Sequence, residues 1–393
     1  MELESPSRME PALPEPVSGE LLDLVAELSS AAGAVDARLH PTSAAGLAEA
    51  VRMMNCYFSN LIEGHNTTPH EIEAAVANYI PNHGDRRNLL IEARAHIRLQ
   101  REIDRQHAAG ALPDPASPNF IRWLHREFYN GATADMLDVE GRFTMVPGEF
   151  RALPGEDVTV GRHQPPSASA VAAFMAHFET RYRLARLGAG SRLLAMAAAH
   201  HRLNYIHPFL DGNGRVSRLM SHAMGLQAGV GAHGLWSVSR GLARGLRSRR
   251  EYKLMMDRAD TPRQGDLDGR GNLSLSALQE FCAWFLTVCL DQVRFMSRLF
   301  ALDALMPRLR IYAERRQWRP EAALLLERAM QQGEVSRGDA TAITGLRERS
   351  ARTLLGTMTG DGILGSVTPK GPVSLRFRID AIEILFPGLF PET

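Results

Sequence analysis

Apolar side chains recur at helix-compatible intervals through much of the chain. Between residues 19 and 110 they fall at three- and four-residue steps, for example at Leu21, Val25 and Leu28. Such spacing places them on one face of a helix. Later in this region Thr68-Pro69 supplies a capping residue followed by a proline, a pair that favours a helix start. We therefore predict that residues 19–110 are helical.

Two further helices are predicted on either side of a short turn in the middle of the chain. Residues 191–206 are rich in Leu and Ala and contain no helix breaker, whereas Pro208 disfavours the α conformation at His207. A second helix is expected from near Arg215 to Gly229. His207 is thus predicted to end the first helix and to face outward.

The region before these helices carries the one clear β signal of the central part. Two short alternating runs, 150–153 and 158–160, flank the turn sequence Pro154-Gly155-Glu156-Asp157. We predict a β-hairpin whose second strand contains Val158, Thr159 and Val160. The edge of such a hairpin can bind an extended segment of another protein through main-chain hydrogen bonds. The alternative is an ordinary surface hairpin.

The C-terminal part changes character. Helices are predicted over 321–331, 336–343 and 349–360, followed by a hairpin with strands 363–367 and 373–377. This order resembles a winged helix. Its basic residues could contact DNA phosphate, form a solvated face or pack on the rest of the chain. They are Arg347, Arg349, Arg352, Lys370, Arg376 and Arg378.

Together these patterns predict a mainly α protein. We expect a loose tail over residues 1–18, an N-terminal helical region over 19–118, an all-helical core with a short hairpin over 119–305, and a winged-helix-like domain over 320–393.

Composition limits the choice of partner and compartment. The 393 residues are 45% hydrophobic, and 45 Lys and Arg face 44 Asp and Glu, so net charge gives no reason to expect a nucleic-acid or membrane partner. No run approaches membrane-spanning length and no signal peptide is recognisable, which favours the cytoplasm. Three scattered cysteines are expected to be buried and reduced.

Residues 207–218 gather the chemistry of the chain into one turn. They read His207-Pro208-Phe209-Leu210-Asp211-Gly212-Asn213-Gly214-Arg215-Val216-Ser217-Arg218. The two glycines permit positive φ angles, so that backbone N–H groups can surround an anion at the start of the next helix. His207 is a candidate general base, Asp211 can hold Mg²⁺, and Arg215 and Arg218 can both reach a polyphosphate. The pattern predicts a nucleotide triphosphate site.

At these residues the chain resembles the Fic (filamentation induced by cAMP) domain family, whose motif H-P-F-x-[DE]-G-N-G-R-x-x-R is matched at every fixed position. The resemblance implies transfer of AMP from ATP to a Ser, Thr or Tyr hydroxyl of a protein, with automodification. It assigns the base to His207, Mg²⁺ to Asp211, the nucleotide to the Gly212-Asn213-Gly214 turn, and the phosphates to Asn213, Arg215 and Arg218. It also implies that Tyr252 contacts adenine and that the predicted hairpin docks the target.

A second motif lies upstream. Ser59-Asn60-Leu61-Ile62-Glu63-Gly64 matches the inhibitory pattern [ST]-x-x-x-E-[GN] of that family. Ser59 and Glu63 share a helix face, and Gly64 can end the helix in a left-handed conformation. We expect the Glu63 carboxylate to pair with Arg218 and so to exclude the γ-phosphate of ATP. The alternative is a solvated glutamate at a helix end.

Two other functions remain open from the sequence. The same site can run in reverse, with Glu63 orienting a water that removes AMP from a modified protein. Alternatively, the chain is a DNA-binding regulator whose core senses nucleotide. The target protein and the oligomeric state, homodimer included, stay undetermined.

Overall fold

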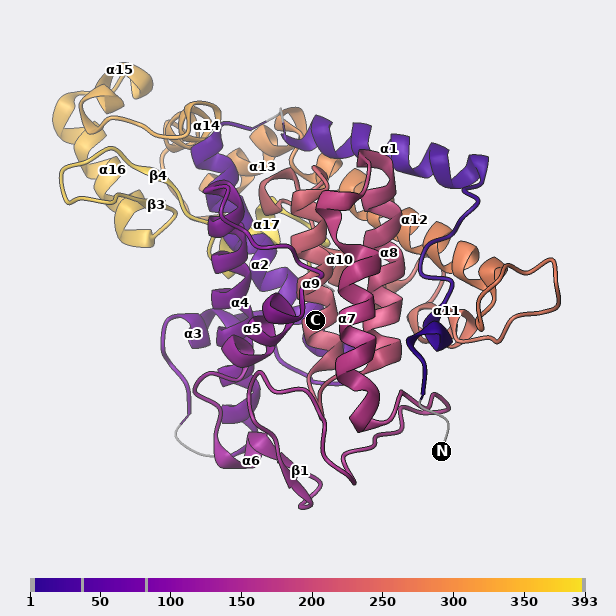
Figure 1. Ribbon diagram of the computed structural model, residues 1–393. Coiled ribbons are helices and arrows are strands. Elements are labelled where there is room, and N and C mark those ends of the chain that lie inside the picture. The colour runs from indigo at the N-terminus through magenta and orange to yellow at the C-terminus, as the bar shows by residue number, and fades with distance from the viewer. Residues whose placement is uncertain (1–3, 37–38, 82–83, 391–393) are drawn as a thin grey trace. The chain divides into compact units, whose positions relative to one another are not determined.

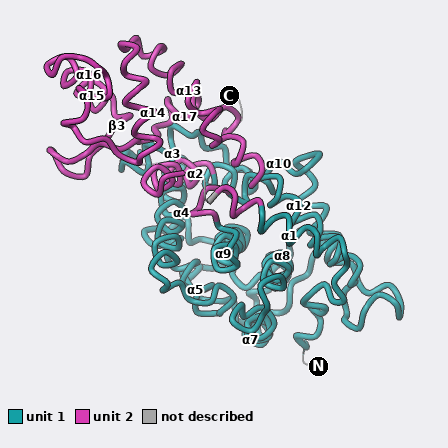
Figure 2. Tube along the Cα trace, turned by 90° about the horizontal axis from the view of Figure 1, so that it is seen from above, with its two compact units in different colours: residues 1–30, 55–231, 237–292 teal, residues 31–54, 232–236, 293–393 magenta. Residues whose placement is uncertain are grey.

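The structure is a computed structural model that describes residues 4–36, 39–81 and 84–390. It is mainly helical, as predicted, and contains two short two-stranded hairpins (Figure 1). The chain divides into two compact units, coloured separately in Figure 2. Unit 1 comprises residues 1–30, 55–231 and 237–292, and unit 2 comprises residues 31–54, 232–236 and 293–393.

Unit 1 begins with a short 3-10 helix and is otherwise built mostly from α-helices. Its elements are η1 (Pro6–Met9), the first part of α1 (Gly19–Asp36), the end of α2 (Pro41–Ile62), α3 (Pro69–Val76), α4 (Asp85–Ala108), α5 (Pro118–Phe128), α6 (Ala134–Leu137), β1 (Asp138–Val139), β2 (Phe143–Thr144), η2 (Ala168–Ala170), α7 (Val171–Tyr182), η3 (Leu184–Arg186), α8 (Ala189–Ile206), α9 (Asn213–Gln227), α10 (Val238–Arg244), α11 (Glu251–Ala259) and most of α12 (Leu275–Leu299).

Helix α8 lies at the centre of unit 1. From residue 193 to residue 206 all of its side chains but that of Asn204 are buried, which explains why its sequence has no polar face. It packs against α7 on one side and α9 on another, and α9 in turn packs against α4 and α5. The Ala-rich stretch 195–199 allows the neighbouring helices to approach closely. The predicted helix over 191–206 is confirmed.

The N-terminal segment differs from the loose tail that we expected. Met9 and Ala12 are fully buried, and the carbonyl of Ala12 accepts a hydrogen bond from the Tyr182 hydroxyl. The Glu10 carboxylate binds His177, and the Glu10 carbonyl accepts from the Leu273 N–H. The described part of the segment is therefore ordered, because its apolar side chains and its backbone both find partners in unit 1.

The predicted hairpin over 150–160 is wrong as regards its strands. The turn at Pro154 and Gly155 forms, but Val158 and Thr159 are extended loop and Val160 makes only an isolated bridge to His163. The reason lies in competing partners. The Glu156 carboxylate accepts from the N–H groups of residues 152 and 153, and the Arg151 N–H donates to the Pro208 carbonyl. These backbone N–H groups are therefore not available for hydrogen bonds between two strands.

A hairpin does form just upstream of that segment. Asp138 pairs with Thr144 and Val139 with Phe143 in an antiparallel register. The connecting Glu140 and Gly141 both have positive φ, and the Asp138 carboxylate accepts the Gly141 N–H. This hairpin was not predicted, because its strands are only two residues long.

Unit 2 contains the C-terminal elements. Its elements are the end of α1, the start of α2, η4 (Ala232–Gly234), the end of α12, α13 (Leu302–Arg315), α14 (Ala322–Gln332), η5 (Arg337–Asp339), α15 (Ala340–Thr344), α16 (Glu348–Asp361), β3 (Leu364–Gly365), β4 (Ser374–Leu375) and α17 (Ile379–Leu385). The three helices and the hairpin after residue 320 occur in the predicted order. That they form a winged helix and bind DNA stays a prediction.

Residues 31–54 join these C-terminal elements rather than the N-terminal helical region in which we placed them. The Ser43 hydroxyl donates to the carbonyls of Ala329 and Met330 at the end of α14. Gly46 lies against the Leu375 carbonyl and the Phe377 ring. Helix α2 therefore contributes its first part to unit 2 and its last part, residues 55–62, to unit 1.

Two simpler expectations concern cysteines and membranes. Cys56, Cys282 and Cys289 are all buried free thiols, as expected. Among the described residues, none of the helices combines the length and apolar character that crossing a bilayer would require.

Candidate active site

The motif over residues 207–218 forms the connection between α8 and α9. His207 ends α8 with φ 49° and ψ 61°, a left-handed conformation that carries the chain out of the helix, as Pro208 led us to expect. The ring of Phe209 is fully buried and stacks on His125 of α5 at 3.9 Å between centroids. His125 also accepts the Gly148 N–H through Nδ1, so that its Nε2–H points to the Asp211 carbonyl at 3.2 Å.

Asn213 closes this loop. Its side-chain oxygen accepts from the Phe209 N–H and its amide donates to the Phe209 carbonyl, both at 2.9 Å. The side chain is buried and both of its ends are occupied. We expected Asn213 to hold phosphate with Arg215. In the structure its side chain instead braces the loop.

A buried arginine secures the end of α8. Arg151 donates from Nε to the His207 carbonyl at 2.7 Å and from Nη2 to the Ile206 carbonyl at 3.1 Å. A cation at a helix C-terminus is favourable because the last carbonyls lack helical partners. Burial and the charge of Arg151 lower the pKa of His207 to about 4. His207 is therefore neutral near pH 7, as a general base must be.

The first turn of α9 is tightly enclosed by other side chains. Gly212 has a φ of +80°, and a Cβ atom there would lie 2.9 Å from the Tyr129 ring. A Cβ atom on Gly214 would lie 2.6 Å from Oε1 of Glu63 and 3.0 Å from Nη1 of Arg218. Position 212 therefore favours glycine for its conformation, whereas a side chain at Gly214 would have to displace the Glu63 carboxylate. The helix begins at Asn213, two residues earlier than predicted.

Arg218 is held by the upstream motif, as expected. Its Nη2 donates to Oε1 of Glu63 at 2.5 Å, and its Nε donates to the Ser59 hydroxyl at 3.0 Å. Burial acts to raise the pKa of Glu63, but the positive charges of Arg218 and Arg215 outweigh it and the pKa is lowered. Helix α2 ends at Ile62, so Glu63 lies in the following turn, and Gly64 has the expected positive φ.

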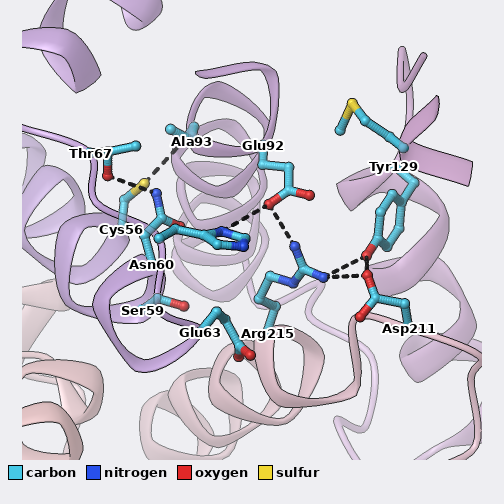
Figure 3. A network of polar contacts seen from close by, with 12 residues as sticks. Cys56, Ser59, Asn60, Glu63, Thr67, Glu92, Ala93, Tyr129, Asp211 and Arg215 are labelled. Atoms are coloured by element: carbon cyan, nitrogen blue, oxygen red, sulfur yellow. Dashed lines mark hydrogen bonds and ion pairs between the residues drawn. The ribbon is translucent and has the colours of Figure 1, made fainter. Parts of the chain in front are cut away.

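Arg215 lies between two carboxylates (Figure 3). Its Nη1 donates to Oε2 of Glu92 on α4 at 2.6 Å. Its Nη2 donates to Oδ2 of Asp211 at 2.6 Å and to the Tyr129 hydroxyl at 2.8 Å. The Tyr129 hydroxyl donates in turn to Asp211 at 2.8 Å. Both arginines of the motif are thus paired with acids, although Nε of Arg215 is buried without a hydrogen-bond partner.

Asp211 fits the role of a magnesium ligand. Burial would raise the pKa of Asp211, but Arg215, Tyr129 and the Gly212 N–H lower it to about 2, so it is ionised. Its side chain is 53% exposed and can be reached by a cation. No group of three or more acids, histidines or cysteines that could hold a metal is found among the described residues. Magnesium in nucleotide sites typically uses one or two carboxylates with phosphates and waters.

Tyr252 lines a small cavity of about 140 Å³ at the end of α2. The remaining lining residues are Leu61, Ile62, Leu242, Ala243, Arg249 and Lys253. The Tyr252 hydroxyl is bonded to His200 at 2.9 Å, which in turn bonds Ser221. The Tyr252 hydroxyl is thus already bonded within the protein, while the residue lines the cavity.

Most of the predicted site residues come together. The residues of the predicted hairpin do not, and the side chain of Asn213 bonds the backbone of Phe209 where we expected it to hold phosphate. Val158, Thr159 and Val160 form no strand beside the site. Sequence reasoning missed four supporting residues, Glu92, His125, Tyr129 and Arg151, because each acts on the motif from a separate segment and carries no local signature.

Comparisons with known proteins match the part of the chain that carries this site. The Fic/DOC family profile matches residues 115–224. The relatives named "Protein adenylyltransferase Fic" from Drosophila erecta and from Aedes aegypti are each 39% identical over 82 residues, which is 21% of this chain and 16% of the relative. The chain thus matches about one sixth of the length of these relatives.

Two solved structures share the fold. A Fic family protein from Desulfovibrio desulfuricans has a TM-score of 0.53 at 19% identity, and the likeness covers 93% of this chain and 98% of that one. A Fic domain-containing signaling protein from Bacteroides thetaiotaomicron has a TM-score of 0.51 at 18% identity, covering 71% and 96%. The chain therefore contains a domain of the Fic/DOC family, and the turn between α8 and α9 is part of it.

Proposed function

We propose that the chain is a protein adenylyltransferase that moves AMP from ATP to a hydroxyl side chain of a target protein, and that it also modifies itself. The described conformation is its inhibited form. The matched relatives bear the name protein adenylyltransferase, and the Fic/DOC family match includes the whole motif over 207–218. The carrying observation is that a neutral His207, an accessible Asp211 and two arginines converge on one helix start.

The nucleotide is proposed to lie along the first turn of α9. Its phosphates accept from the backbone N–H groups at residues 212–214, where the positive end of the helix dipole favours an anion. Arg215 and Arg218 supply the counter-charge for the β- and γ-phosphates. The base enters the cavity at Tyr252 and stacks on its ring.

His207 then acts on the incoming hydroxyl. Its imidazole takes the proton as the hydroxyl oxygen forms a bond to the α-phosphorus. The bond between the α-phosphorus and the oxygen bridging to the β-phosphate breaks, and pyrophosphate leaves with that oxygen. Asp211 would hold Mg²⁺, which neutralises charge on the phosphates when it is bound. The protein supplies position and electrostatic stabilisation, which is most of what such a transfer requires.

Inhibition follows from the contacts of Arg218. Oε1 of Glu63 occupies the Nη2 atom that a γ-phosphate would use, and the same carboxylate lies against Gly214 in the turn that receives the phosphates. A polyphosphate and this carboxylate would repel each other at that position. ATP therefore cannot settle with its γ-phosphate on Arg218 until Glu63 moves.

The test is which phosphate of ATP becomes covalently attached to the protein. We expect incubation with ATP and Mg²⁺ to make protein radioactive from α-labelled ATP and not from γ-labelled ATP, weakly in the wild type and strongly when Glu63 is replaced. His207→Ala should remove the covalent label, by about a hundredfold to ten-thousandfold in rate, while ADP still binds. Covalent γ-label, or a His207→Ala variant with undiminished transfer, would refute adenylyl transfer.

The reverse reaction is the second candidate, and the position of Glu63 favours it. A carboxylate that is partly exposed beside the phosphate turn can orient a water as well as block a phosphate. If removal is the function, a pre-adenylylated target should lose AMP with the wild type and keep it with Glu63→Gly. Forward transfer that rises in Glu63→Gly without any loss of removal activity speaks for inhibition alone.

A further inference from the structure

Glu92 is the one acid of the site network that lies deep within a helix. It is the eighth residue of α4, its side chain is only 10% exposed, and α4 packs directly on α9. Arg215, its partner, is also buried. It donates a hydrogen bond from Nη1 to Glu92 and one from Nη2 to Asp211 (Figure 3). A single guanidinium is therefore shared by a buried carboxylate and an accessible one.

We propose that Glu92 is a positioning residue, the permanent counter-ion of Arg215, which allows Asp211 to leave that arginine and bind a divalent cation. This inference rests on the metal role that the proposed function gives to Asp211. It assigns to Glu92 no contact with nucleotide or target. Oε2 of Glu92 also lies 3.8 Å from Nδ1 of His65, but in this arrangement Glu92 acts on the site through Arg215.

The physical argument starts from the cost of a buried charge. Arg215 stays ionised, and removing both carboxylates from it would leave a charge in a dry environment without a partner. Asp211 can turn toward a cation only if another anion stays on Arg215. Glu92 is suited to this because its side chain is only 10% exposed and α4 packs on α9, whereas the side chain of Asp211 is 53% exposed.

Tyr129 completes the arrangement. Its hydroxyl donates to Asp211 and accepts from Arg215, so it helps to hold Asp211 near the arginine in the resting state. When Asp211 turns away, the hydroxyl still accepts from Arg215. The guanidinium then keeps one anionic and one neutral partner, both buried.

A consequence for metal affinity follows. Without the negative charge of Glu92, Asp211 becomes the only carboxylate bonded to Arg215, and a cation must compete with that arginine for it. Supporting residues of this kind typically change metal affinity by about tenfold to a hundredfold. We expect Glu92→Gln, which keeps an acceptor oxygen but loses the charge, to weaken cation binding by about tenfold.

The experiment measures cation binding without turnover. Mn²⁺ replaces Mg²⁺ and is titrated into the full chain with saturating ADP, which needs no contact at Arg218. Binding is followed by water-proton relaxation, which responds to Mn²⁺ held on a slowly tumbling protein. The matched control is Asp104→Asn, because Asp104 also lies on α4 and pairs with His222 of α9 at 2.6 Å, with 12% and 8% exposed side chains.

The expected result is an Mn²⁺ dissociation constant raised about tenfold in Glu92→Gln and unchanged in Asp104→Asn. An unchanged constant in a folded Glu92→Gln variant, or an equal rise in the control, would overturn the inference. If Glu92→Gln does not fold, Glu92→Asp keeps the charge but draws it back from Arg215, and its constant should rise less than tenfold but measurably. No rise there also overturns the inference. Absence of Mn²⁺ binding by the wild type would instead count against the proposed function.

Discussion

Two buried arginines lie three residues apart on α9, yet their acidic partners come from different kinds of position. Arg218 is held by Glu63, which lies in the turn after α2 and has a 31% exposed side chain. Arg215 is held by Glu92, which lies within α4 and has a 10% exposed side chain. Both contacts are short, at 2.5 and 2.6 Å.

The difference shows that the position of the acid, rather than the length of the contact, decides what an ion pair can do. Glu63 can leave by local rearrangement of a turn, which costs little and exposes its carboxylate to water. Glu92 has less access to water, because its side chain is 10% exposed and α4 packs on α9. The first pair is suited to a switch, and the second to permanent support.

The largest effect that tests this difference is on stability. Glu92→Ala should lower the free energy of unfolding by about 3–5 kcal/mol, because it leaves the buried Arg215 with less charge compensation. Glu63→Ala should cost only about 1 kcal/mol, because Ser59 still accepts from Arg218 and water can enter at the helix end. Urea denaturation of both variants measures the two values. Equal losses would show that the pairs do not differ in kind.

The second prediction concerns activity. Glu63→Gly should raise automodification by about tenfold to a hundredfold, which corresponds to recovering a charge-assisted hydrogen bond of about 1.5–3 kcal/mol. The rate of label transfer from α-labelled ATP measures it. Adding Arg218→Ala should remove the gain, since Glu63 acts through that arginine. A double variant as active as Glu63→Gly would show that Glu63 does not act through Arg218.

The third prediction concerns the Ser59 hydroxyl, the other side chain bonded to Arg218, and its expected effect on activity is smaller. Ser59→Ala removes the hydroxyl that accepts from Nε of Arg218 but leaves Glu63 in place. The acceptor is a neutral hydroxyl rather than a carboxylate, so with a contribution of about 0.5–1.5 kcal/mol automodification should rise only about twofold to tenfold. Ser43→Ala, which alters α2 at its other end, is the control and should leave the rate unchanged. A Ser59→Ala variant no faster than that control would mean that Glu63 alone fixes Arg218.

The sequence was sufficient for one of the two pairs. The motif over 207–218 is local, and the short pattern from Ser59 to Gly64 could be matched to it, so the contact of Glu63 with Arg218 was expected and is found. Glu92 and Arg215 are 123 positions apart, and Glu92 stands in an ordinary charged helix. No spacing rule connects them, and only the packing of α4 on α9 does.

The incorrect hairpin has a related cause. Alternating residues at 158–160 favour a strand, but a strand also needs free backbone donors and acceptors on its partner. The backbone N–H groups of residues 151–153, which would face this strand, instead donate to the Pro208 carbonyl and the Glu156 carboxylate. Helices α8 and α9 were predictable because their hydrogen bonds are internal, whereas the hairpin depended on competition with one nearby carboxylate and one distant carbonyl.

The smallest expected effect is that of pH on the Glu63 pair. Because the pKa of Glu63 is lowered in the folded protein, its pair with Arg218 is complete above the usual carboxyl range and weakens only as pH falls through that lowered value. His207, with a pKa of about 4, also stays neutral over the same interval. The ratio of the automodification rates of Glu63→Gly and wild type should therefore be constant between about pH 6 and 8. Rates of α-label transfer at matched Mg²⁺ and ATP give this ratio. A ratio that falls toward one at pH 6 would require a different titrating group to release Arg218, and the Glu63 carboxylate would then not be the element that sets the inhibited state.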